Sequence, residues 1–160
     1  MGKLQVGDEA PDFELKDQDG NIVKLSEFKG KYPVVLFFYP KDKTYGCTRE
    51  ACSFRDKMSE FNELNAKVFG VSSDSVESHK SFADEQKLTF PLLSDEGGKV
   101  RKLYGVPKSM FIMPGRCTYV IGPDGIVRHI YNSQVGFANH VEEAKKALEK
   151  IRNDAQTAEE

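Results

Sequence analysis

The strongest constraint on the fold is the junction between a wholly apolar segment and an amphipathic one. Residues 34–38, Val-Val-Leu-Phe-Phe, are mostly β-branched or aromatic and carry no polar side chain, which favours a strand buried on both faces. Downstream, apolar residues recur three or four apart, as on one face of a helix: Ala51, Phe54, Met58, Phe61 and Leu64. Cys47 therefore lies where a strand turns into a helix. Free backbone N–H groups and the positive end of the helix dipole there favour a reactive thiolate.

Length and composition limit the classes of protein to consider. A chain of 160 residues fits one domain, and 39% hydrophobic with 30% charged residues is typical of a soluble protein. A net charge of -2 gives no electrostatic basis for binding nucleic acid or an anionic membrane. No apolar run approaches the roughly 20 residues of a membrane helix, and the N-terminal residues show no signal-peptide core. Three cysteines, an odd number, argue against a secreted disulfide framework.

The remaining elements follow from periodicity and turn signals. Asp19-Gly20 between short apolar segments predicts a β-hairpin, and Asp74 or Ser75 would cap a helix that begins near residue 75. We expect strands at 13–15, 22–25, 32–39, 66–73, 90–93, 117–121 and 126–131, a short helical turn at 26–30, and helices at 47–65, 75–86, 98–104 and 139–151. This order predicts an α/β fold with a mixed sheet and helices on both faces.

The segment around Cys47 also resembles a known family. Pro40, Thr44 and Cys47, at the spacing Pro-x-x-x-Thr-x-x-Cys, resemble the active-site motif of the peroxiredoxins. A second cysteine at Cys52 is similar to the peroxiredoxin Q branch, also called the bacterioferritin comigratory protein branch. One departure is Tyr45, where many members have proline directly before the Gly-Cys pair.

The resemblance covers nearly the whole chain. Residues 114–121 and 130–132 resemble the second half of that branch, its plant and algal members in particular, and the likeness extends over residues 6–151. It implies a thioredoxin-like fold with an N-terminal hairpin, in a single domain over residues 1–160. We expect the core within 6–151 and a frayed tail at 152–160, which has no apolar content beyond residue 152 except alanine.

Besides Cys52, the resemblance implies roles for four side chains of this chain, each of which also has a plainer interpretation. Cys47 would attack the peroxide O–O bond and become a sulfenic acid; otherwise it is a packed apolar residue of the helix. Pro40 would shield the thiolate, and Thr44 would orient the peroxide or the thiolate; otherwise Pro40 is an ordinary strand terminator and Thr44 a turn residue or helix cap. Arg116 matches the family's second-half arginine, which would stabilise the thiolate, against the alternative of a surface charge. Arg49 is a weaker candidate that we interpret as a surface residue.

Cys52 is the expected resolving cysteine, which would condense with the sulfenic acid to a Cys47–Cys52 disulfide. Five residues along an α-helix rise about 7.5 Å and leave the two Cα atoms about 8 to 9 Å apart. A disulfide needs about 4.4 to 6.8 Å, so oxidation must unwind the start of this helix. The alternative is an inert, half-buried cysteine.

The other polar residues are assigned structural roles. Cys117 is interpreted as a packed strand cysteine, and Glu50 as an acidic residue that complements the helix dipole. We interpret the histidines as surface or strand-face residues: His79, His129 and His140. The spacing of the three cysteines does not suit structural zinc, and no Gly-rich phosphate loop is present.

These observations lead to one principal function and two alternatives. The principal hypothesis is an antioxidant peroxidase that reduces hydrogen peroxide or an alkyl hydroperoxide, is recycled by a thioredoxin-type reductant, and uses no metal, flavin or haem. Since resolution would be intramolecular, we expect a monomer. The resemblance suggests a plastid, or otherwise the bacterial cytoplasm. A general thiol–disulfide oxidoreductase would need Cys-x2-Cys, which is absent; a redox-sensing binding module would use the same disulfide to recruit a partner.

Overall fold

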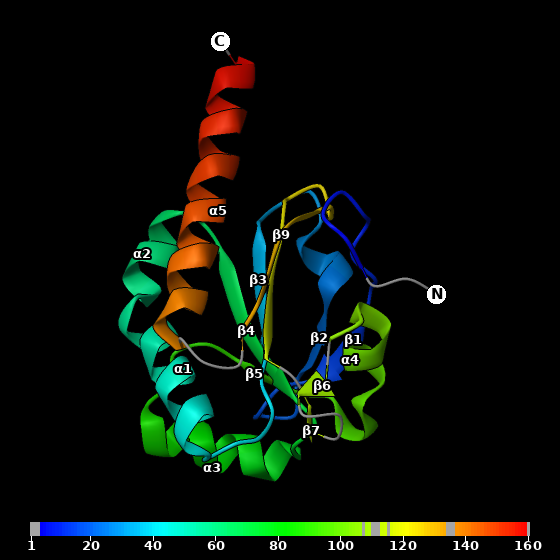
Figure 1. Cartoon of the computed structure of the whole chain (residues 1–160), viewed down its shortest axis with the longest axis vertical. Coiled ribbons are helices and arrows are strands. Elements are labelled where there is room, and N and C mark those ends of the chain that lie inside the picture. Colours follow the sequence, from blue (N-terminus) through cyan, green and yellow to red (C-terminus); the bar gives the residue numbers. More distant parts are fainter. Residues whose placement is uncertain (1–3, 107, 110–112, 115, 134–136, 160) are drawn as a thin grey trace.

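The computed structural model describes residues 4–106, 108–109, 113–114, 116–133 and 137–159 of the chain (Figure 1). The main sheet has seven strands in the order β2-β1-β5-β4-β3-β8-β9. Its strands are β1 (Glu14–Lys16), β2 (Ile22–Lys24), β3 (Val34–Phe38), β4 (Lys67–Ser72), β5 (Leu92–Ser94), β8 (Cys117–Ile121) and β9 (Val127–Asn132). A second sheet pairs β6 (Lys108–Ser109) with β7 (Met113–Pro114). The helices are η1 (Leu25–Phe28), α1 (Tyr45–Asp56), α2 (Met58–Glu63), α3 (Val76–Gln86), η2 (Glu96–Gly98), α4 (Lys99–Tyr104) and α5 (Phe137–Glu159).

β3 is the middle of the fold, as its apolar sequence predicts. It pairs parallel with β4 and antiparallel with β8, and none of its residues is more than 1% exposed. Its side chains alternate between two hydrophobic clusters, one on each face of the sheet. Val35 and Phe37 pack with residues of α1, α3 and α5, whereas Val34, Leu36 and Phe38 pack with residues of η1, β8 and α4. Figure 1 shows α1, α2 and α5 on one side of the sheet and α4 on the other. The mixed α/β fold is therefore confirmed.

Most predicted elements are present, with small shifts at their ends. β1 and β2 form the expected antiparallel hairpin, and Gly20 takes the positive φ of 82° that its turn requires. Of the two candidate caps for α3, Ser75 holds the position, and its side chain accepts a hydrogen bond from the Ser78 amide.

Two helices differ from their predicted extents. The expected helix over 47–65 is divided at Lys57 into α1 and α2, yet Phe54 and Phe61 remain wholly buried and stack at 5.7 Å. Periodicity misses such a break because the apolar stripe continues across it. α5 extends to Glu159, beyond the predicted end at residue 151, and Figure 1 shows its last turns projecting past the sheet. Good helix formers such as alanine, glutamine and glutamate can continue a helix without apolar contacts. None of the described helices is both long enough and apolar enough to cross a membrane.

Candidate active site

The loop that follows β3 places the predicted motif residues around the start of α1. Thr44 is the N-cap of α1, but its hydroxyl donates to the Lys41 carbonyl at 2.8 Å and does not cap the helix. Cys47 is the third residue of α1 and is 1% exposed, within the hydrophobic cluster that contains Phe37. Pro40 is half-buried and Thr44 is exposed. The hydrogen bond recorded for the Thr44 hydroxyl is thus with its own loop, not with the Cys47 sulfur.

Arg116 is the residue that the fold brings to Cys47 from far along the chain. It directly precedes β8, whose first residue, Cys117, lies opposite Phe38 at the end of β3. This antiparallel register carries Arg116 to the start of α1, where Nη2 lies 3.5 Å from the Cys47 sulfur. Arg116 is 5% exposed and therefore not the surface charge of the plainer interpretation. A buried guanidinium at this distance stabilises a thiolate over a thiol.

Glu50 was predicted wrongly. It lies in the second turn of α1, is 0% exposed, and pairs with Arg116 through Oε1 and Nη1 at 2.8 Å. Burial raises the pKa of Glu50 to about 7, although the Arg116 charge opposes the shift. Desolvation lowers the pKa of Arg116, but the charges of Glu50 and Cys47 outweigh it, and the pKa is raised. The sequence did hold a signal for this pair. Glu50 occupies the apolar stripe of Cys47, Ala51 and Phe54, and a charge on such a stripe must be buried and paired.

His140 was also predicted wrongly, since it is 0% exposed and lies behind Glu50. Its Nε2 donates to the Ser133 carbonyl at 2.9 Å, so Nδ1 accepts from the Thr118 hydroxyl at 2.7 Å. Burial lowers the pKa of His140 to about 4, which keeps the ring neutral at pH 7. Nδ1 is also 3.4 Å from Glu50 Oε2. A row of contacts thus connects Cys47, Arg116, Glu50 and His140, and joins α1, β8 and α5 behind the thiol.

The two other cysteines occupy different surroundings. Cys52 is half-buried on α1, and its sulfur lies 3.4 Å from Oε1 of Gln86 at the end of α3. All three cysteines are free thiols, and α1 is continuous between Cys47 and Cys52. Cys117 is 1% exposed and packs in the cluster on the opposite face of the sheet from Cys47. The sheet separates these two sulfurs, which agrees with a packing role for Cys117.

A second buried polar group lies beside this loop. His79, predicted to be a surface residue, is 0% exposed and bonds Asp42, whereas His129 is half-buried on β9 and pairs with Glu143 at 3.0 Å. Asp42, Asp74 and His79 form the one group with metal-like spacing in the described part of the chain, their ligand atoms lying within 4.8 Å of one another. Those atoms already hydrogen-bond to protein groups. Exposed Arg49 fits its predicted surface position.

Comparison with known proteins identifies the family. Residues 6–130 match the AhpC/TSA family. The chain is 51% identical over 153 residues to the chloroplastic peroxiredoxin Q of Sedum lineare, covering 95% of this chain and 82% of that protein. It is also 51% identical over 149 residues to chloroplastic peroxiredoxin Q of Arabidopsis thaliana, covering 92% of this chain and 68% of that protein.

Solved structures give the same result. The crystal structure of peroxidoxin BcpB from Mycobacterium tuberculosis has a TM-score of 0.86 and 40% identity, covering 92% of this chain and 98% of that one. A bacterioferritin comigratory protein from Xanthomonas campestris, studied for alkyl peroxide reduction, has a TM-score of 0.82 and 31% identity, covering 92% of this chain and 96% of that one. The chain therefore belongs to the AhpC/TSA family and is a thiol-dependent peroxidase of the peroxiredoxin Q type, with the thioredoxin fold of that group.

Proposed function

We propose that Cys47 is the peroxidatic residue and reduces hydrogen peroxide and organic hydroperoxides. The observation that carries this proposal is the buried guanidinium of Arg116, 3.5 Å from the Cys47 sulfur. It favours the thiolate and offers fixed N–H donors to a peroxide oxygen. Alkyl peroxide reduction by the Xanthomonas campestris relative supports the substrate class.

The reaction proceeds by displacement at oxygen. The Cys47 thiolate attacks one peroxide oxygen, the O–O bond breaks, and the alkoxide or hydroxide leaves with a proton as alcohol or water. The sulfur retains the transferred oxygen as a sulfenic acid. Pro40, half-buried at the end of β3, limits access of water to this position, and Thr44 orients the peroxide once substrate contacts replace its bond to Lys41.

Cys52 resolves the sulfenic acid. Its thiol attacks the Cys47 sulfur, water leaves, and a Cys47–Cys52 disulfide forms after α1 unwinds. A thioredoxin-type dithiol then reduces the disulfide by exchange and is itself oxidised. Because both cysteines lie in one chain, the cycle needs no second subunit, and we propose a monomer. The chloroplastic relatives support a plastid location, with the bacterial cytoplasm as the alternative.

The test follows peroxide consumption by the whole protein with thioredoxin and thioredoxin reductase. Wild type should turn over many times, whereas Cys47→Ser should consume no peroxide above background. A Cys47→Ser protein as fast as wild type would refute the assignment. Mass spectrometry of the oxidised protein should show Cys47 linked to Cys52. One stoichiometric oxidation without turnover would instead indicate a redox-sensing module.

A further inference from the structure

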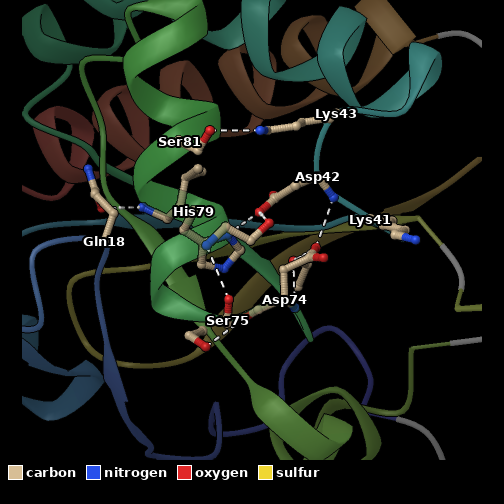
Figure 2. Close-up of polar contacts among 12 residues, drawn as sticks. Gln18, Lys41, Asp42, Lys43, Asp74, Ser75, His79 and Ser81 are labelled. Carbon is tan, nitrogen blue, oxygen red and sulfur yellow. Dashed lines mark hydrogen bonds and ion pairs between the residues drawn. The ribbon is translucent and has the colours of Figure 1, made fainter.

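A buried pair of side chains, Asp42 and His79, connects the loop before α1 to the rest of the fold (Figure 2). Asp42 is 5% and His79 0% exposed. Nδ1 of His79 lies 2.7 Å from Asp42 Oδ2, and Nε2 lies 3.0 Å from the Leu93 carbonyl of β5. Since a carbonyl oxygen only accepts hydrogen bonds, Nε2 of His79 donates to Leu93, while Nδ1 shares a hydrogen bond with Asp42. His79 therefore bridges the loop to β5.

Asp42 is held from further directions as well. Its Oδ1 accepts from the Tyr39 hydroxyl at 2.6 Å, and its Oδ2 also accepts from the Ser78 hydroxyl at 2.8 Å. Its backbone N–H donates to Asp74 Oδ2 at 2.8 Å, an oxygen that also accepts from the Ser72 hydroxyl at 2.6 Å. Groups from the residue after β3, from the loop between β4 and α3, and from α3 itself thus converge on one loop residue. A buried network in which every member is satisfied is rigid and fixes a single arrangement.

The position of this network matters because α1 must unwind and refold. Lys43, the next residue, reaches Ser81 of α3 at 2.7 Å (Figure 2). At the far end of α1, Nη1 of Arg55 donates to the Gln86 carbonyl at 2.6 Å. α3 therefore holds the chain on both sides of the segment that contains the two reactive cysteines. Of the three attachments, through Asp42, Lys43 and Arg55, that of Asp42 is the most buried.

We propose that Asp42 and His79 are positioning residues for the peroxidase reaction, and that they hold the fixed end from which α1 starts. This inference rests on the proposed function of Cys47. The pair keeps the loop of Pro40 and Thr44 in place, so the N-terminal turn of α1 returns to one geometry after each oxidation. A displacement of about 1 Å at a reacting group can cost about 100-fold in rate, so loosening this attachment slows the attack on peroxide.

The test uses two substitutions of His79, each of which keeps one of its two hydrogen bonds and removes the other. In His79→Asn the side-chain amide can still donate to Asp42 in place of Nδ1, but does not reach Leu93. In His79→Gln the longer amide can still donate to Leu93 in place of Nε2, but the Asp42 carboxylate loses the hydrogen bond that Nδ1 made and keeps those from Tyr39 and Ser78. Both variants lose the ring and one buried hydrogen bond, so their losses of thermal stability should be similar. The rate of Cys47 oxidation by one equivalent of hydrogen peroxide is measured by rapid quench, alkylation and mass spectrometry.

We expect His79→Gln to be at least about ten-fold slower than wild type and His79→Asn to retain most of the rate. Equal losses in both variants, in proportion to stability, would overturn the proposal and leave a purely structural role. If neither variant folds, Asp74→Ala and Asp74→Asn replace them. The asparagine keeps an acceptor for the Asp42 amide, so only the alanine variant should slow oxidation, and equal rates again refute the proposal. Wild type tests the proposed function separately. If Cys47 of wild type is not oxidised by hydrogen peroxide, the proposed function of Cys47 is refuted, whereas the comparison of the variants tests only the role of Asp42 and His79.

Discussion

Substitution of Tyr45 by proline should slow disulfide formation by holding the first turn of α1 closed. Tyr45 is the first helical residue and is 76% exposed. Proline suits this position, because the N–H of the first helical residue has no partner within the helix. The preceding residue, Thr44, already has φ -76° and ψ 157°, the extended conformation that a residue before proline prefers.

The start of α1 is otherwise weakly secured. Thr44 makes no side-chain cap and the first turn holds no acidic residue, whereas α3 is capped by the Ser75 hydroxyl. Burial of Cys47 in the first turn and of Ala51 in the second, at 1% and 0% exposure, therefore provides much of what keeps the start of α1 folded. Proline at a compatible position restricts the unwound chain and stabilises the folded one by about 0.4 to 1 kcal/mol.

This free energy corresponds to an equilibrium constant for unwinding that is about two- to five-fold smaller in Tyr45→Pro than in wild type. If unwinding precedes bond formation as a rapid equilibrium, the Cys47–Cys52 disulfide should form about two- to five-fold more slowly in Tyr45→Pro. The melting temperature should rise by about 1 to 4 °C. Rapid quench with alkylation and mass spectrometry separates sulfenic acid from disulfide over time, and excess peroxide should yield more sulfinic acid.

Tyr45→Ser is the matched control, because serine and tyrosine have similar helix propensities and serine has no ring restraint on φ. It should form the disulfide at the wild-type rate. Equal or faster disulfide formation in the proline variant would refute the requirement for unwinding at this turn.

Three further outcomes are expected. Between about pH 4.5 and 7, the free energy of unfolding of wild type should fall by about 3 kcal/mol relative to that of Glu50→Gln. The pKa of Glu50 is raised to about 7 in the folded state, so in this range the folded state holds a proton that the unfolded state has lost. Urea unfolding measures both proteins, and a difference between them that does not change with pH would contradict this. Arg116→Met should slow Cys47 oxidation by about 100-fold or more. It should also lower the free energy of unfolding by about 3 to 5 kcal/mol, because Glu50 stays buried but loses the cation that it pairs with. A stopped-flow oxidation rate equal to that of wild type would exclude a role for the guanidinium. Cys117→Ser should leave steady-state turnover nearly unchanged, since Cys117 packs on the opposite face of the sheet from Cys47, and a large loss would show that this thiol takes part.

The elements near Cys47 could be predicted from sequence because local rules govern them. An apolar run such as 34–38 has little alternative to a buried strand, and the stripe from Ala51 to Leu64 has little alternative to a helix face. The motif around Cys47 indicates the family, and the helical spacing of Cys47 and Cys52 is the basis for the proposed unwinding. None of these inferences needs a contact between distant residues.

The surroundings of the thiol were decided by tertiary structure. Glu50 looked like a helix-dipole residue, and His79 and His140 like surface residues, until the pairing of β8 with β3 and the packing of α3 and α5 buried them. Residue type and spacing can place Glu50 on the apolar stripe of α1, but they cannot identify its partner, which comes from 66 residues away. Burial without such a partner would cost several kcal/mol. Cys47 and the motif around it can therefore be recognised in the sequence, whereas the charges and hydrogen bonds around Cys47 are a property of the folded chain.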